Sequence, residues 1–267
     1  MSLLTLKLIR LDERNENIFW DHVNRSPLNH YWFILDWRFQ RPDTEITMAM
    51  DGDRIEGMML IFKNSIVQLR GARAAVKDLM ERLRLETLQL TAPFDCGDIV
   101  SEFYSYPAKY EIMMMHMDKG QERPVIVHEP ETLSPKDAED IARVVREANY
   151  EWWDQVTAES VRNSIKNNFW KGIRREGRVV AVGSTRFEQI GSNIGIIATD
   201  KAYRNQGFAT SIVSSLALEI FRTHTKALIH VLVNNDPAIH VYSKVGFRPY
   251  TSFFMIRKGQ RISETHS

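Results

Sequence analysis

Short apolar runs that predict strands alternate along this chain with longer stretches in which apolar residues recur at helical spacing. Apolar runs on both sides of Gly52 predict a β-hairpin over residues 46–62, because an Asp-Gly pair between two such runs favours a tight reversal. A similar pair of runs on both sides of Gly177 predicts a second hairpin over residues 169–187.

Each predicted hairpin is followed by a strand, a helix and another strand. The strands before the helices are expected at Ile66–Leu69 and Ile194–Thr199, which are short and rich in β-branched residues. The helices are expected at residues 72–84 and from Phe208 onward, where one face is apolar. The second of these stripes consists of Phe208, Ile212, Leu216 and Ile220.

This order of elements occurs twice, which predicts an internal repeat and a mixed α/β fold of two domains. The polar segment Asp118–Pro124 suggests the boundary, with domains at residues 1–120 and 121–267. A strand at Val125–His128 is expected to open the second domain. The general frequency of hairpin-strand-helix units is the alternative explanation of the repeat.

A candidate anion site lies between the strand that ends at Thr199 and the helix that starts near Phe208. The backbone N–H groups at the start of a helix have no partners within the helix, and they lie at its positive end. Gly207 has no Cβ and Ala209 is small, so an anion can approach closely. The segment Arg204–Thr210 therefore predicts a phosphate cradle, although a glycine turn of this kind also occurs without any ligand.

Composition narrows the classes of function. The chain has 267 residues, 43% of them hydrophobic, with a net charge of +1, so no general affinity for nucleic acid or membrane surfaces is expected. Its single cysteine, Cys96, excludes an intramolecular disulfide and favours a reducing, cytoplasmic location. No apolar run approaches the length of a membrane span, and no cluster of residues at metal-ligand spacing is found.

A second element follows the predicted strand Leu228–Val233. Asp236 is expected to cap a helix that has Pro237 in its first turn and Gly246 at its end. With the segment at Arg204, this element resembles two motifs of the GNAT superfamily of acyl-CoA N-acyltransferases. The first motif is carried by Arg204, Gly207 and Ala209, and the second by Asn235, Ala238, Tyr242, Lys244, Gly246 and Phe247.

The resemblance implies two tandem GNAT-like domains, each a mostly antiparallel sheet with helices on both faces and a splay between two central strands. It also implies acetyl-CoA, or another acyl-CoA, as cosubstrate, and no metal. The residues that would bind it are Ile197, Ala198, Thr199, Arg204, Asn205, Gln206, Gly207, Phe208, Ala209, Thr210, Asn235 and Tyr242. At Leu69–Arg73 the first half lacks the motif, a layout similar to glycine N-acyltransferase-like members.

Acyl transfer to an amine needs a proton donor for the leaving thiolate and an acceptor for the amine proton. By the resemblance, Tyr242 is the general acid. Glu188, Glu151 and Asp154 are candidate bases, of which we choose Glu188, and a water-mediated route is equally open. Trp152 and Trp153 either fill a gap between two helices or form a lid over the acceptor.

The sequence therefore predicts a CoA-dependent N-acyltransferase, most simply an acetyltransferase, that acts by direct attack in a ternary complex. The acceptor is expected to be a primary amine of a small molecule, peptide or protein, and the enzyme a monomer or homodimer. The first domain would serve as a scaffold or as an acceptor-side wall. The alternative is a non-catalytic acyl-CoA-binding or interaction module that has lost transfer activity.

Overall fold

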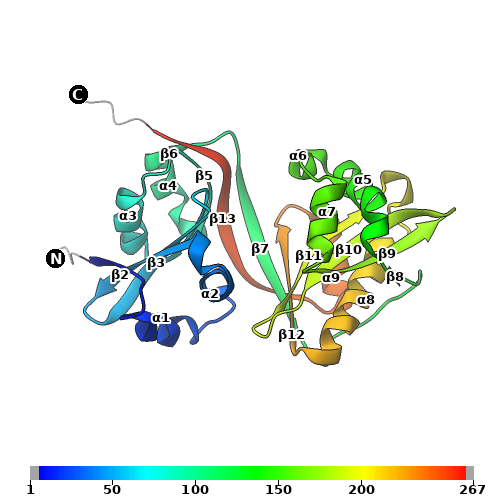
Figure 1. Cartoon of the computed structure of the whole chain (residues 1–267), viewed down its shortest axis with the longest axis horizontal. Coiled ribbons are helices and arrows are strands. Elements are labelled where there is room, and N and C mark those ends of the chain that lie inside the picture. Colours follow the sequence, from blue (N-terminus) through cyan, green and yellow to red (C-terminus); the bar gives the residue numbers. More distant parts are fainter. Residues whose placement is uncertain (1–5, 263–267) are drawn as a thin grey trace. The chain divides into compact units, whose positions relative to one another are not determined.

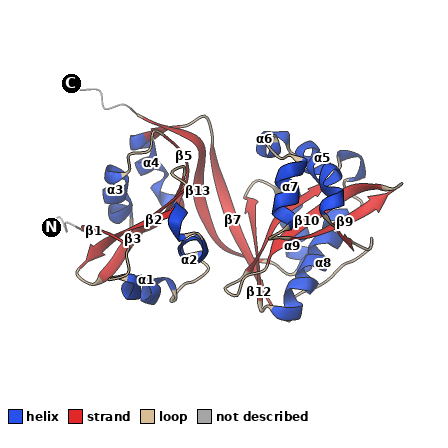
Figure 2. Cartoon of the chain, viewed as in Figure 1, coloured by secondary structure: helices blue, strands red, loops and turns tan. Residues whose placement is uncertain are grey.

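A computed structural model describes residues 6–262 of the chain (Figure 1). Its contacts divide the chain into two compact units, Met1–Ile112 with Thr251–Ser267, and Met113–Tyr250. The first unit is therefore discontinuous in sequence, because its last strand comes from the end of the chain. Each unit combines helices and strands (Figure 2), as a mixed α/β fold requires.

The first unit contains the first predicted hairpin, and the strand that follows it, in the expected order. Its strands run β1-β2-β3-β4-β5-β13, with β4 and β5 parallel and the other pairs antiparallel. The elements are β1 Lys7–Arg10, α1 Glu16–Val23, α2 Tyr31–Phe39, β2 Thr44–Asp51, β3 Arg54–Phe62, β4 Ile66–Gly71, α3 Arg73–Arg82, β5 Thr87–Pro93, α4 Gly97–Phe103 and β6 Tyr104–Ser105. β7 Lys109–Asp118 begins in this unit, and β13 Arg248–Arg261 ends in it.

The second unit repeats this order of hairpin, strand, helix and strand. Its strands run β8-β9-β10-β11-β12, with β11 and β12 parallel, and the end of β7 lies beside β12. The elements are β8 Glu131–Thr132, α5 Ala138–Ala148, α6 Tyr150–Trp153, α7 Ala158–Ile165, β9 Phe169–Arg175, β10 Arg178–Arg186, β11 Ser192–Thr199, α8 Phe208–Thr223, β12 Lys226–Leu232 and α9 Asp236–Val245.

Helices cover both faces of the second sheet, because alternate residues of each strand enter different cores. Ile173 and Ile197 pack with the apolar stripe of α8 and with α9. Trp170 and Ala198, on the same two strands, pack instead with α5 and α7. Side chains that alternate between the faces of a strand thus join two helical layers to one sheet.

The helix termini follow local sequence chemistry, with one correction. A capping box links Ser134 to Asp137 at the turn before α5, and a second links Thr157 to Ser160 at α7. The N-cap of α9 is Asn235, whose Oδ1 accepts a hydrogen bond from the Ala238 N–H at 3.3 Å. Asp236 is therefore the first helical residue, where its charge complements the helix dipole.

Residues 125–128 do not form the expected strand. They lie along α8, where the Val125 N–H donates to Ser214 Oγ at 2.9 Å and the Val127 N–H donates to Ser211 Oγ at 3.1 Å. Two buried serines thus replace a neighbouring strand as partners for this backbone. Among residues 6–262, no helix combines the length and the apolar character that crossing a membrane requires.

The end of α9 provides a test of this packing. Gly246 has φ +121°, and a Cβ there would lie 2.5 Å from the backbone oxygen of Gln121. We expect Gly246→Ala to lower the free energy of unfolding by about 2–4 kcal/mol, through backbone strain and displacement of the backbone segment at Gln121. Chemical denaturation of the purified variant measures this loss.

Gly177, in the turn between β9 and β10, is the matched control. Its φ is +80°, but a Cβ there would meet no atom within 4 Å. Gly177→Ala should therefore cost about 1 kcal/mol, from backbone strain alone. If the two variants lost the same free energy of unfolding, close contact with Gln121 would not contribute to the cost of Gly246→Ala.

Candidate cofactor site

The two parallel strands at the centre of the second unit separate after three paired residues. β11 pairs with β12 at Ser192↔Ala227, Asn193↔Leu228 and Ile194↔Ile229, and the ladder ends there although both strands continue. Gly195, the next residue of β11, is exposed. This is the splay that the GNAT resemblance implied.

Beyond the splay, one edge of β11 has no neighbouring strand among residues 6–262. On the other edge, the Asp200 N–H donates to the Val180 carbonyl at 2.8 Å, and the Ile196 N–H donates to Ser184 Oγ at 3.2 Å. Since backbone groups alternate along a strand, Ile197 and Thr199 direct theirs toward the side that β12 has left. Thr199 Oγ1 is also buried and lacks a hydrogen-bond partner among the described residues.

The free edge of β11 leads into the start of α8. A 3-10 turn at Lys201–Tyr203 is followed by Asn205 and Gly207, both in the left-handed region with φ +59° and +83°. Phe208 begins the helix, and the first hydrogen bond that closes it runs from the Ser211 N–H to the Gly207 carbonyl at 3.0 Å. The N–H groups of the first helical residues before Ser211 therefore have no partner within the helix.

The side chains of this segment do not all face a ligand. Phe208 and Thr210 are buried in the core, so only their backbone can contribute to a site. The Arg204 guanidinium donates to the Ala148 carbonyl at 2.8 Å, and its Nε donates to the Thr199 carbonyl at 3.5 Å. Arg204 therefore caps the C-terminal end of α5 and fastens the loop to it.

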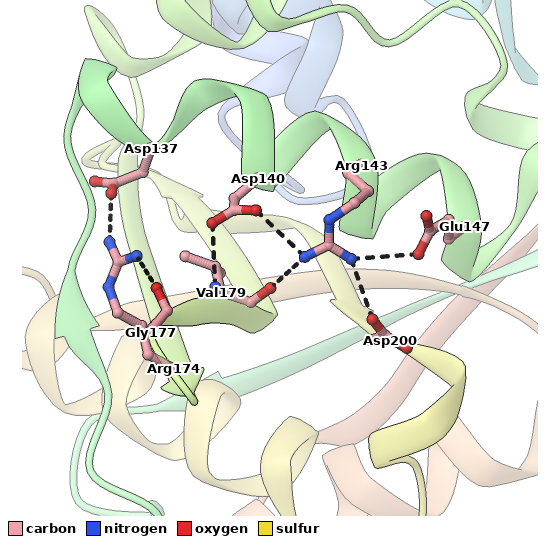
Figure 3. Close-up of polar contacts among 8 residues, drawn as sticks. All are labelled: Asp137, Asp140, Arg143, Glu147, Arg174, Gly177, Val179 and Asp200. Carbon is pink, nitrogen blue, oxygen red and sulfur yellow. Dashed lines mark hydrogen bonds and ion pairs between the residues drawn. The ribbon is translucent and has the colours of Figure 1, made fainter.

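An ion-pair network around Arg143 fixes the end of β11 in place (Figure 3). The Arg143 guanidinium contacts Asp200 at 3.1 Å and Asp140 at 3.4 Å, and it donates to the Val179 carbonyl at 2.7 Å. Hydrogen bonds to Asp200 and Asp140 outweigh the effect of burial and raise the pKa of Arg143. The same guanidinium contacts Glu147 at 3.3 Å, so Asp200, the only carboxylate in the loop, shares one positive charge with two other carboxylates.

Tyr242 lies on α9 in the core of the second unit, where 7% of its surface is exposed. Burial raises the pKa of its phenol to about 12, so the group is protonated at neutral pH. Its hydroxyl makes no side-chain hydrogen bond with the rest of residues 6–262. At neutral pH the phenol of Tyr242 therefore carries a proton that it can donate.

The candidate base and the tryptophans lie elsewhere in the second unit. Glu188 follows β10, and its carboxylate, 12% exposed, accepts from Arg186 Nε at 2.7 Å. The neighbouring Phe187 stacks on His224 at the C-terminal end of α8, which is the end opposite the cradle. Trp152 and Trp153 lie on α6, and Trp153 packs against the core formed with α5.

The first unit has a splay without a cradle. β4 pairs with β5 at Ile66↔Gln89, Val67↔Leu90 and Gln68↔Thr91, as β11 pairs with β12. Two residues further on, Arg70 is buried, and it donates to the carbonyls of Asn29 at 2.9 Å and Leu69 at 2.7 Å. α3 begins at Arg73, directly after β4, so there is no loop to hold an anion.

Comparisons with known proteins agree with this geometry. Residues 171–255 match the family described as FR47-like protein. No curated protein matches the sequence. The family match and the structural similarities below support the resemblance to the GNAT superfamily.

Three solved structures share the fold over most of the chain. A Drosophila protein is 12% identical, with a TM-score of 0.68, over 94% of this chain and 98% of that one. A tandem GNAT protein from the clavulanic acid biosynthesis pathway is 13% identical, with a TM-score of 0.60, over 97% and 99%. A putative acetyltransferase from Pyrococcus horikoshii is 14% identical, with a TM-score of 0.58, over 97% and 91%.

The fold is therefore that of tandem GNAT proteins. In the part of the chain that the structure describes, no group of three or more His, Cys, Asp or Glu residues could hold a metal ion.

The buried phenol of Tyr242 predicts a pH dependence of stability. Below pH 10 the group is protonated in both the folded and the unfolded chain. Between pH 10 and 12 only the unfolded chain ionises, so folding loses about 2–3 kcal/mol as pH rises through this window. We expect the unfolding free energy of wild type to fall by this amount more than that of Tyr242→Phe, measured by denaturation from pH 8 to 12. Parallel curves would contradict the assignment.

Proposed function

We propose that this protein is a CoA-dependent N-acyltransferase that moves an acyl group, most simply acetyl, from acyl-CoA to a primary amine. The observation that supports this function most directly is the free edge of β11, which leads from the splay at Ile194 to the open N-terminus of α8. An amide-bearing arm can add to such an edge as an extra strand, while phosphates occupy the helix end.

In this proposal the second half of the chain, residues 121–267, binds the cosubstrate. The backbone of Ile197–Thr199 would bind the pantetheine amides and polarise the thioester carbonyl, and the N–H groups of Asn205–Thr210 would bind the pyrophosphate. Asn235 would donate from Nδ2 to the pantetheine arm, since its Oδ1 already caps α9. Residues 1–120 would act as a scaffold.

Transfer proceeds by direct attack of the amine on the thioester carbonyl carbon. A C–N bond forms, the C–S bond breaks, and the sulfur receives the proton of the Tyr242 hydroxyl. Glu188 takes the proton that the amine loses, either directly or through a water molecule. Trp152 and Trp153 would form a wall of the acceptor site. Holding both substrates together gives a ternary complex rather than an acyl-enzyme.

Removing the Tyr242 hydroxyl tests the proton donor. We expect Tyr242→Phe to lower kcat for acetyl transfer about 100-fold or more while the Kd for CoA changes little, because general acid catalysis contributes about 10²–10⁴-fold. Labelled acetyl-CoA with a panel of amines, amino acids and peptides measures transfer, and calorimetry measures binding. Tyr106→Phe, which removes a hydroxyl in the first unit, is the control. Tight binding without transfer to any acceptor would instead support a non-catalytic acyl-CoA-binding module.

Glu188 is tested separately. Glu188→Gln should lower kcat/KM at least 10-fold near neutral pH and flatten the acidic limb of its pH profile, because the amide cannot accept a proton. Glu219→Gln, which changes the same charge on α8 beside Arg222, should leave the profile as in wild type. An unchanged profile for Glu188→Gln would assign deprotonation to water.

A further inference from the structure

Arg175, the last residue of β9, is a cation whose contacts are all with uncharged groups. Its guanidinium donates to the Arg174 carbonyl at 2.8 Å and to His128 Nδ1 at 2.6 Å, and it lies 4.9 Å from the centre of the Phe208 ring. Within residues 6–262 no carboxylate lies at ion-pair distance from it. The neighbouring acids Glu131 and Asp137 are bound by Arg174 instead.

His128 orients this guanidinium. Its Nε2–H donates to the Gln206 carbonyl at 2.8 Å, which leaves Nδ1 to accept from Arg175, and these two partners together assign the neutral tautomer. The imidazole stacks on Phe208 with centroids 4.0 Å apart and an interplanar angle of 15°. The backbone N–H of His128 also donates to Ser211 Oγ at 3.2 Å. The ring is thus held on several sides, and it joins Arg175 to the loop before α8.

The electrostatics of this corner favour an anion. The guanidinium of Arg175 lies beside Phe208, the first residue of α8 and thus at its positive end, and His128 links it to the Gln206 carbonyl in the preceding loop. Placing a guanidinium beside a helix N-terminus is unfavourable unless negative charge enters. An incoming phosphate would relieve this repulsion and could accept two parallel hydrogen bonds from the fork of Arg175.

We propose that Arg175, positioned by His128, binds a phosphate group at the nucleotide end of CoA. The inference rests on the proposed function, and it adds a charged side-chain contact to a cradle that otherwise offers backbone N–H groups. His128 is a positioning residue, because it acts through Arg175 and Gln206. The segment that carries His128 thus becomes part of the cofactor site.

Binding by the full chain, measured by calorimetry, tests the proposal without requiring catalysis. We expect Arg175→Gln to raise the Kd for CoA about 10-fold or more and to weaken its dependence on salt, because a charge-assisted contact is lost. Arg222→Gln removes the same charge at the other end of α8 and should leave the Kd unchanged. Dephospho-CoA, which lacks the 3′-phosphate, identifies the group that Arg175 contacts. If Arg175→Gln weakens the binding of CoA but not of dephospho-CoA, the contact is with the 3′-phosphate. If the Kd rises equally for both ligands, the contact is with the pyrophosphate.

Two substitutions of His128 separate positioning from packing. Gln can donate to the Gln206 carbonyl and accept from Arg175, so His128→Gln should retain a Kd within about 3-fold of wild type. His128→Leu keeps an apolar contact with Phe208 but neither hydrogen bond, and it should raise the Kd as much as Arg175→Gln. The double variant His128→Leu/Arg175→Gln should be no weaker than either single variant, because both act on one contact.

These measurements distinguish failure of the Arg175 contact from failure of the proposed function. If wild type binds CoA and Arg175→Gln binds it equally well, the Arg175 contact is wrong and the proposed function stands. If wild type does not bind CoA at all, both the proposed function and this contact are wrong. Thermal unfolding of each variant shows whether a changed Kd reflects loss of fold.

Discussion

The second unit depends on the separation of β11 from β12 beyond Ile194. A sheet that parts at its centre leaves backbone N–H and C=O groups without partners, and such groups are costly unless water or a ligand binds them. The surrounding contacts hold the strand in this state. Arg143 joins the end of β11 to α5 and β10, and Arg204 ties the following loop to the same helix. In the proposed function, this preorganised edge would accept the amides of the pantetheine arm as an added strand.

In the first unit, two central strands also separate, but no loop lies between the first of them and the helix that follows. The pairing of its central strands, β4 and β5, also ends after three residues, but α3 follows β4 without a loop like the one before α8. The guanidinium of Arg70 packs 4.0 Å from the Phe253 ring centre and is bound by backbone carbonyls. Burial lowers the pKa of Arg70 to about 9, so the group remains charged at neutral pH and needs these carbonyl partners. The two units share a fold, and local sequence distinguishes their sites.

Predictions from the sequence succeeded where the determining interactions are short-range. The hairpins, the strand before α8, and the glycine turn at Gly207 depend on periodicity and on turn residues a few positions apart. The prediction at 125–128 was wrong because apolar runs do not reveal what will bind their backbone, and here buried serines of α8 do so. The cap of α9 shifted by one residue for a related reason, since Asn and Asp are both good caps and side-chain geometry selects between them.

The sequence by itself determined the class of fold, the glycine turn before α8 and the helix that carries Tyr242, because each depends on residues within a single stretch of chain. Only the tertiary structure decided how these stretches meet. His128 contacts a carbonyl 78 residues away, and Arg175 contacts His128 across 47 residues. The final strand of the chain adds to the first unit rather than to the half that precedes it in sequence. Such contacts depend on which surfaces pack together, and no local pattern of residues specifies that choice.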